Sequence, residues 1–122
     1  MKIEIIKLKG VGIAEIKSDK VEIRKVQDVL DLMADCDYQG ARKIILHEKN
    51  IVANFFDLKT GFAGEILQKF SNYFVELAIV GDFSKYSSQS LQDFIYESNK
   101  IGRINFVSSV EEAIEALLKH EK

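Results

Sequence analysis

The pattern of hydrophobic and polar positions changes character along the chain. Near the amino terminus the two kinds of residue alternate, and this predicts two short strands at Lys2–Leu8 and Gly12–Ile16. Further on, short apolar runs alternate with segments whose apolar residues recur every three or four positions, the spacing of one helix face. The apolar runs predict three more strands, at Lys43–His47, Val75–Val80 and Arg103–Val107. The helical spacing predicts helices over about Lys25–Tyr38, Thr60–Phe74 and Ser88–Lys100, and a final one begun by a capping box of Ser108 with Glu111 or Ser109 with Glu112.

Each predicted helix has an apolar face that we expect to be buried against a sheet. In the first helix this face comprises Val26, Val29, Leu30, Met33 and Ala34, and in the second Phe62, Ala63, Ile66, Leu67, Phe70 and Phe74. In the third it comprises Leu91, Phe94, Ile95 and Ile101, and in the last Val110, Ala113, Ile114, Leu117 and Leu118.

The order of the elements predicts the fold class. Strands that alternate with helices favour right-handed crossovers and parallel pairing, whereas the opening two strands form an antiparallel pair. We therefore predict an α/β fold with a mixed, mostly parallel five-stranded sheet and about four helices. The 122 residues fit a single domain, 1–122, with no linker or repeat.

Composition narrows the classes of partner. The chain carries 17 basic and 19 acidic residues, a net charge of -2, so nothing favours binding to nucleic acid or to an anionic membrane. No apolar run approaches the roughly 20 residues that span a bilayer, and the charged amino terminus lacks the apolar core of a signal peptide. The single cysteine, Cys36, has no intramolecular disulfide partner. These features predict a cytoplasmic protein.

Candidate binding residues follow the predicted strands, because sites in open α/β sheets gather beyond the carboxyl ends of parallel strands. After the strand at Lys43–His47, the segment Asp57–Gly64 places Asp57, Lys59, Thr60 and Gly61 before a helix, whose amino terminus can hold an anion or a phosphorylated hydroxyl. Ordinary helix capping by Asp57 or Thr60 explains the same residues, and base rates favour capping.

A second candidate loop follows Val80. Asp82, Ser84, Lys85 and Tyr86 can bind a small polar ligand, or they can serve as turn and cap residues before a helix that Ser87 or Ser88 opens.

We assign no catalytic residue, no metal site and no cofactor. His47 and Glu48 are adjacent, but no further ligand lies at a metal-binding spacing, and the chain has no HExxH, CxxC or GxSxG motif. Cys36 has no histidine near it in the sequence, which favours a structural helix residue over a nucleophile. Enzymatic activity is therefore the less favoured interpretation.

Three long segments carry a resemblance to a known family. NFFDLKTGFAGEILQKFSNY at 54–73, AIVGDFSKY at 78–86 and SLQDFIYESNKIGRINF at 90–106 resemble the bacterial family of unknown function numbered 4180. The resemblance runs through most of the chain, but the family name carries no activity.

The order of elements is also similar to that of the STAS domain of anti-sigma factor antagonists. In those domains an Asp-Ser-Ser-Gly loop follows an internal strand, opens a helix and is phosphorylated by a partner kinase. The segment Asp57–Gly61 has the comparable place here, and matching the second serine makes Thr60 the phosphoacceptor. The pattern departs at Leu58 and Lys59, which are not serines, and at an extra segment, Asn50–Phe56.

Two functions remain open. The first is a STAS-like regulatory module that binds a partner protein through the Asp57–Gly64 loop and through Glu65, Gln68, Lys69 and Asn72 on the following helix. The alternative is a small-molecule binding protein or enzyme that uses the 57–64 and 81–88 loops together. We also predict a homodimer, because Lys2–Leu8 can lie at a sheet edge and pair with a second copy, although the lysines of this segment oppose uncontrolled pairing.

Overall fold

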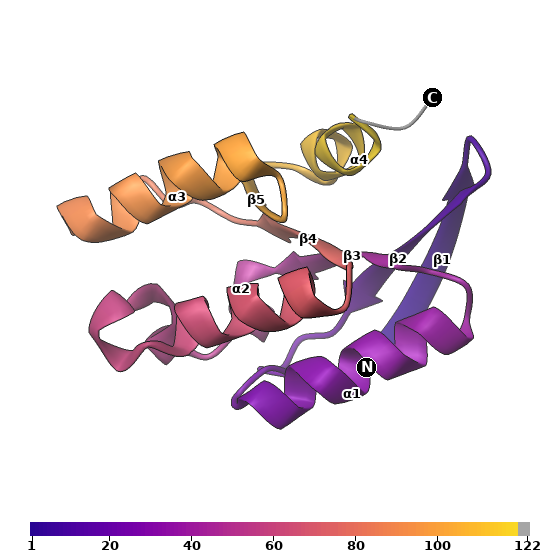
Figure 1. The fold of residues 1–122 in the computed structure, drawn as a ribbon, viewed down its shortest axis with the longest axis horizontal. Helices are drawn as coiled ribbons and strands as arrows, with labels where there is room; N and C mark the ends of the chain where they lie inside the picture. Colours follow the sequence, from indigo (N-terminus) through magenta and orange to yellow (C-terminus); the bar gives the residue numbers. More distant parts are fainter. Residues whose placement is uncertain (120–122) are drawn as a thin grey trace.

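The computed structural model describes residues 1–119, and its elements follow the predicted order (Figure 1). The strands are β1 (Lys2–Leu8), β2 (Val11–Lys17), β3 (Lys43–His47), β4 (Glu76–Val80) and β5 (Ile104–Val107). The α-helices are α1 (Val26–Tyr38), α2 (Phe62–Asn72), α3 (Gln89–Ile101) and α4 (Val110–Leu118). None of the described helices has the length and apolar character needed to cross a membrane.

The strands form one sheet in the order β1-β2-β3-β4-β5. β1 pairs antiparallel with β2, from Lys2 opposite Lys17 to Leu8 opposite Val11. β2, β3, β4 and β5 pair in parallel, and a helix precedes each of β3, β4 and β5. The predicted α/β class and the mixed, mostly parallel five-stranded sheet are therefore confirmed.

The two faces of the sheet are covered unequally. α1, α2 and α3 contribute side chains to the core on one face, where Ile44 and Leu46 of β3 point. On the opposite face Ile45 packs with Ala113 and Leu117 of α4. Figure 1 shows α1 and α2 side by side along one face and α4 on the other. The consecutive apolar residues of β3 are thus buried on both sides, as their run predicts.

Three residues predicted to face inward are exposed instead. Ala34 lies on the outer side of α1, because the buried side of that helix is formed by Val29, Leu32, Met33 and Cys36. Phe74 is 74% exposed, since α2 ends at Asn72 and the chain turns there with a left-handed φ of 56°. Ile101 is 69% exposed at the last position of α3, because the buried side of that helix is formed by Leu91, Ile95 and Ser98.

Serine side chains begin two of the helices. The Ser88 hydroxyl accepts a hydrogen bond from the backbone N–H of Leu91 at 3.2 Å, and the Ser109 hydroxyl accepts one from Glu112 at 3.1 Å. The second of the two predicted capping boxes therefore contains the observed cap of α4, and each serine satisfies a backbone donor that the helix itself leaves free.

Candidate functional site

The carboxyl ends of β3 and β4 are followed by the two loops that the sequence singles out. After β3 the chain makes three short 3-10 turns, Glu48–Asn50, Ala53–Phe56 and Leu58–Thr60, before α2 begins. Phe55 and Phe56 anchor this connection, because both are buried in the main core. The segment Asn50–Phe56 is therefore an ordered part of the fold.

Asn50 fixes the beginning of this connection. Its side chain is fully buried, and its amide donates to the carbonyl oxygens of Ser18 and Lys20 at 3.0 and 2.9 Å. Its carbonyl oxygen accepts from the backbone N–H of His47 at 3.2 Å. The amide thus joins the end of β3 to the segment that leads from β2 into α1, and it leaves none of its own buried polar groups unpaired.

A carboxylate joins the two loops at this edge. The Glu48 carboxylate accepts a hydrogen bond from the Tyr86 hydroxyl and forms an ion pair with Lys85 at 2.8 Å. The Tyr86 ring stacks on Phe56, with the ring centroids 5.1 Å apart and the planes 13° from parallel. Gly81 allows this close approach, because a Cβ there would lie 2.7 Å from the Glu48 side chain.

An open groove of about 380 Å³ runs over this cluster. Its lining combines apolar side chains with a carboxylate, two ammonium groups and a phenol; the lining residues are Val21, Glu48, Lys49, Ile51, Ala53, Phe56, Lys85 and Tyr86. The Lys49 ammonium is paired with exposed Asp19 at 3.3 Å, and the Lys85 ammonium lies 5.5 Å from the centroid of the Tyr86 ring. The groove is therefore suited chemically to a small polar ligand with a flat apolar part.

Two groups of the 81–88 loop have shifted pKa values. Burial raises the pKa of Tyr86, and the hydrogen bond and charge of Glu48 raise it further, so the phenol stays a proton donor. The Ser84 hydroxyl and backbone N–H both donate to the Asp82 carboxylate, at 2.6 and 3.1 Å, and they lower the pKa of Asp82. Asp82 and Ser84 thus form a local turn, which matches the second of the two interpretations of these residues.

The loop before α2 is exposed and hydrogen-bonded within itself. Asp57 accepts from the backbone N–H of Lys59 at 3.2 Å. The Thr60 hydroxyl lies 2.8 and 2.9 Å from the carbonyl oxygens of Asn54 and Asp57, and it accepts from the N–H of Phe62 at 3.2 Å. Lys59, Thr60, Gly61 and Glu65 are all exposed.

The structure brings only part of the predicted site together. Tyr86 meets Glu48 and Phe56, whereas within residues 1–119 no hydrogen bond, ion pair or ring contact links Asp57, Lys59, Thr60, Gly61 or Glu65 to Asp82, Ser84 or Tyr86. Sequence reasoning did not assign Glu48 and Phe56 to this site. Two adjacent phenylalanines, Phe55 and Phe56, indicate that the loop is ordered. Nothing in the sequence predicts the contact of Glu48 with Tyr86.

His47 and Cys36, which the sequence raises as a possible metal ligand and a possible nucleophile, each have a defined environment in the fold. His47 Nε2 lies 3.1 Å from the Glu15 carboxylate of β2. Across the described part of the chain, no three histidine, cysteine, aspartate or glutamate residues gather closely enough to hold a metal ion. Cys36 is buried, and burial, together with the charge of Asp35, raises the pKa of its thiol to about 11.

Comparison with known proteins identifies the family and nothing narrower. A search of curated proteins found no match. A family model described as Domain of unknown function (DUF4180) matches residues 8–117, a range that contains all the elements from β2 through β5. Because the match covers most of the chain, it confirms the resemblance seen in the three sequence segments. The chain belongs to the family Domain of unknown function (DUF4180).

Proposed function

We propose that the chain is a regulatory protein-interaction module of STAS-like architecture, which binds a partner protein through the 57–61 loop and the exposed side of α2. The observation that carries this proposal is the position of Thr60. It is exposed and lies two residues before the start of α2. The resemblance to STAS domains matches it to the phosphorylated serine of their loop.

The surface next to Thr60 has the polar character of an interface rim. Glu65, Gln68 and Asn72 are exposed along α2, and the Gln68 amide donates to Asn72 at 2.8 Å. Lys69 is partly buried beside them. A partner can contact this surface without any change in the core, because the apolar side of α2 is occupied by its packing on the sheet.

Phosphorylation of Thr60 would change this surface strongly. The phosphate adds negative charge and removes the hydroxyl proton that now reaches the carbonyl oxygen of Asn54 or Asp57. The first turn of α2 favours the added charge, since the N–H of Phe62 already points at the Thr60 oxygen. The phosphorylated loop can therefore keep its position, while its added charge controls whether the partner binds.

Capture with matched variants tests this function. Partner proteins are captured from extract of the native cells with four tagged baits: wild type, Thr60→Ala, Thr60→Glu and the control Ser84→Glu. Separately, phosphopeptides of the native protein are analysed by mass spectrometry. We expect phosphate at Thr60, and a stoichiometric partner held by wild type, Thr60→Ala and Ser84→Glu but reduced at least tenfold by Thr60→Glu. A partner that binds Thr60→Glu as well as wild type, or no partner and no phosphate at Thr60, would contradict the proposal.

A second candidate function is the binding of a small molecule over the stacked rings of Phe56 and Tyr86. The observation in its favour is the groove in which this pair lies beside Glu48 and Lys85. Amide chemical shifts recorded during a screen of small aromatic acids test it. Shifts concentrated at the groove and abolished by Lys85→Ala support binding there, whereas an unchanged spectrum across the screen opposes it.

A further inference from the structure

β5 is the last strand of the sheet, and its outer side pairs with no other strand within residues 1–119. Backbone N–H groups of β4 and of the residue that follows it donate to the carbonyl oxygens of Arg103 and Val107. Residues at alternate positions therefore direct their backbone groups toward β4, whereas the backbone groups of Ile104 and Phe106 point to the free edge. An edge with unpaired groups of this kind can pair with a strand of another chain.

β5 lacks the features that ordinarily protect such an edge. Its sequence, INFV, contains no charged residue and no proline, and the uncharged run continues through Ser109. The other edge strand, β1, carries Lys2 and Lys7. Short segments of high β-propensity without charge or proline are the ones that associate as strands. Protection of β5 must therefore come from elsewhere in the fold.

The side chain of Asn99 supplies this protection. Asn99 Oδ1 accepts a hydrogen bond from the Phe106 N–H at 2.7 Å, and Asn99 Nδ2 donates to the Phe106 carbonyl oxygen at 3.3 Å. A primary amide offers an acceptor and a donor side by side, and a residue of an antiparallel neighbouring strand presents the same pair of groups. Asn99 thus occupies the place that a sixth strand would take beside Phe106.

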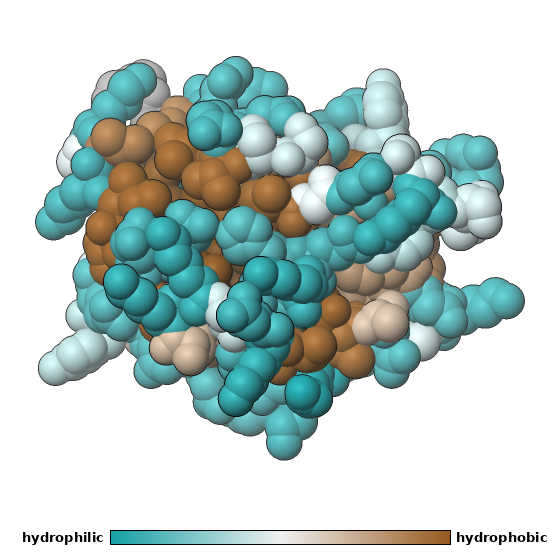
Figure 2. Space-filling model, turned by 180° about the vertical axis from the view of Figure 1, so that it is seen from behind, coloured by the Kyte–Doolittle hydropathy of each residue, from teal (hydrophilic) through white to brown (hydrophobic). Residues whose placement is uncertain are grey.

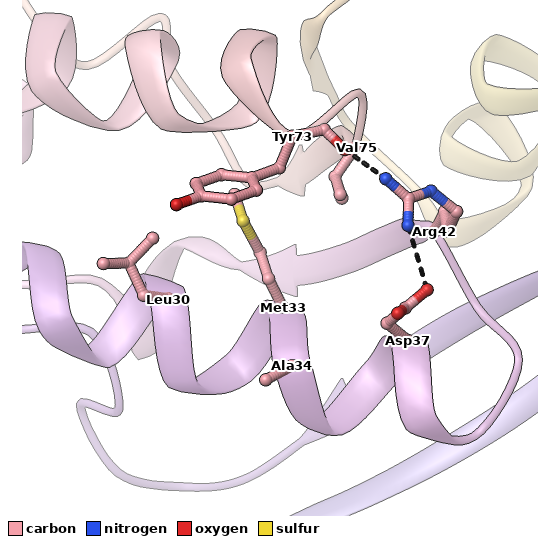
Figure 3. A pocket seen from close by; sticks show the side chains of 7 residues that line it. All are labelled: Leu30, Met33, Ala34, Asp37, Arg42, Tyr73 and Val75. Atoms are coloured by element: carbon pink, nitrogen blue, oxygen red, sulfur yellow. Dashed lines mark hydrogen bonds and ion pairs between the residues drawn. The ribbon is translucent and has the colours of Figure 1, made fainter.

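Arg42 shows how this arrangement differs from the closing of a single free backbone group. Its guanidinium donates to the carbonyl oxygen of Tyr73 at the end of α2 and to the Asp37 carboxylate of α1 (Figure 3). Arg42 satisfies one carbonyl group at a helix end, where a helix leaves such groups free. Asn99 instead pairs with both backbone groups of one strand residue, so it satisfies β5 as another strand would.

α3 holds Asn99 at this edge. Leu91, Ile95 and Ser98 form the buried side of the helix, so α3 is fixed on the sheet while its last turn reaches β5. Figure 1 shows β5 between α3 and α4, and an open hollow of about 480 Å³ between these helices is lined by Asn99 and Phe106. The edge of β5 is therefore open to an incoming strand once the amide is removed.

We propose that Asn99 is an edge cap, which prevents β5 from pairing with the β5 strand of a second copy of the chain. Without the amide, the N–H and carbonyl groups of Phe106 are free to form an antiparallel pair with those of the copy. With the amide in place, the sheet can be extended only at β1. Any assembly through sheet edges then closes at two copies instead of continuing as a filament. The edge cap does not involve Thr60, so the inference is independent of the proposed function.

Two substitutions that remove the same hydrogen bonds test the proposal on the full chain. Asn99→Ala leaves the edge uncharged, whereas Asn99→Lys places a charge beside it, and charge at an edge opposes strand pairing. In dilute solution, we expect the Phe106 amide hydrogen to exchange at least tenfold faster in both variants than in wild type. At tens of micromolar protein, light scattering should give Asn99→Ala at least twice the wild-type mass, and its Phe106 amide should become slow again. Asn99→Lys should keep the wild-type mass.

Gln89→Ala is the matched control, because this amide lies at the other end of α3 and donates to Asp93 at 2.8 Å. It should match wild type in mass and in exchange at Phe106, and circular dichroism spectra establish that each variant is folded. A wild-type mass for Asn99→Ala at every concentration, equal association of Asn99→Ala and Asn99→Lys, or unchanged exchange at Phe106 would each overturn the proposal. All comparisons are made with wild type at the same concentration, so they do not depend on whether β1 pairs.

Discussion

At the scale of single residues, Gly12 in β2 lies closer to the loop after α1 than any side chain allows. A Cβ at this position would lie 2.3 Å from the carbonyl oxygen of Gly40, and the strand cannot move away because β1 and β3 flank it. We expect Gly12→Ala to lower the free energy of unfolding by about 3 kcal/mol, the upper range for overpacking in a core.

Gly64 provides the matched control for this prediction. It lies within α2, where an added Cβ meets no atom within 4 Å. Gly64→Ala should raise the free energy of unfolding by about 0.5–1 kcal/mol, because alanine favours the helix and restricts the unfolded chain. Urea unfolding followed by circular dichroism measures both changes. Changes of the same sign in the two variants would contradict the packing explanation.

The buried thiol gives a second prediction at this scale. Cys36 has no exposed surface, and its pKa of about 11 leaves almost no thiolate near neutral pH. We expect the native protein to react with a thiol reagent at pH 8 no faster than it opens, and the urea-unfolded chain to react within the mixing time. Rapid labelling of the folded protein, with the circular dichroism spectrum unchanged, would show that α1 is less tightly packed than in the structure.

At the scale of elements, Asn50 holds the connection after β3 against the segment between β2 and α1. Asn50→Asp replaces the amide donor with a carboxylate oxygen that faces the carbonyl oxygens of Ser18 and Lys20. The fold then favours the protonated form of this carboxyl, which raises its folded pKa above the usual value of about 4. The lost stability should therefore be small at low pH and should grow as the pH rises toward neutral.

Unfolding at pH 4 and pH 7 measures this dependence. The control is Asn54→Asp, because the Asn54 side chain is exposed and only its backbone carbonyl takes part in the loop. We expect a loss of about 2–4 kcal/mol at pH 7 for Asn50→Asp and a change below about 0.5 kcal/mol for Asn54→Asp. If the free energy of unfolding lost by Asn50→Asp does not depend on pH, the Asn50 side chain stabilises the fold by its shape rather than by donating hydrogen bonds.

Element positions were predictable wherever one periodicity dominated. The consecutive apolar residues Ile44, Ile45 and Leu46 marked β3 because a strand in a parallel sheet is buried on both faces. The assignment failed at Ala34, Phe74 and Ile101, since periodicity shows which residues are apolar but not how far the neighbouring element extends to cover them.

At the scale of the whole molecule, the topology predicts that the candidate loops lie together at the carboxyl ends of the parallel strands. It does not determine which side chains meet there. The contact between Glu48 and Tyr86 spans 38 residues, and it depends on the 3-10 turns that place the Phe56 ring under Tyr86. No spacing in the sequence encodes such a contact. The polar residues Asp57 and Thr60, by contrast, are satisfied within their own loop, where local chemistry makes capping predictable.

The uneven covering of the sheet leads to a prediction about assembly. β1 is an edge strand, and on the face covered by α4 the apolar residues Ile6, Val11, Ile114 and Leu118 are only partly buried. Figure 2, which views the molecule from behind the side seen in Figure 1, shows apolar surface between the polar side chains. If two β1 strands pair about a twofold axis, the sheet continues from one chain into the other and these residues meet their copies.

We therefore expect light scattering at tens of micromolar protein to give twice the chain mass of 13.9 kDa. Ile6→Lys places a charge in the apolar surface beside β1, so it should return a single-chain mass with an unchanged circular dichroism spectrum. The control Lys7→Gln, on the exposed neighbouring residue, removes a charge that opposes pairing and should leave the dimer intact or strengthen it. A single-chain mass for wild type at every concentration would instead mean that the lysines of β1 protect this edge, and that α4 covers enough of the face for the chain to stand alone.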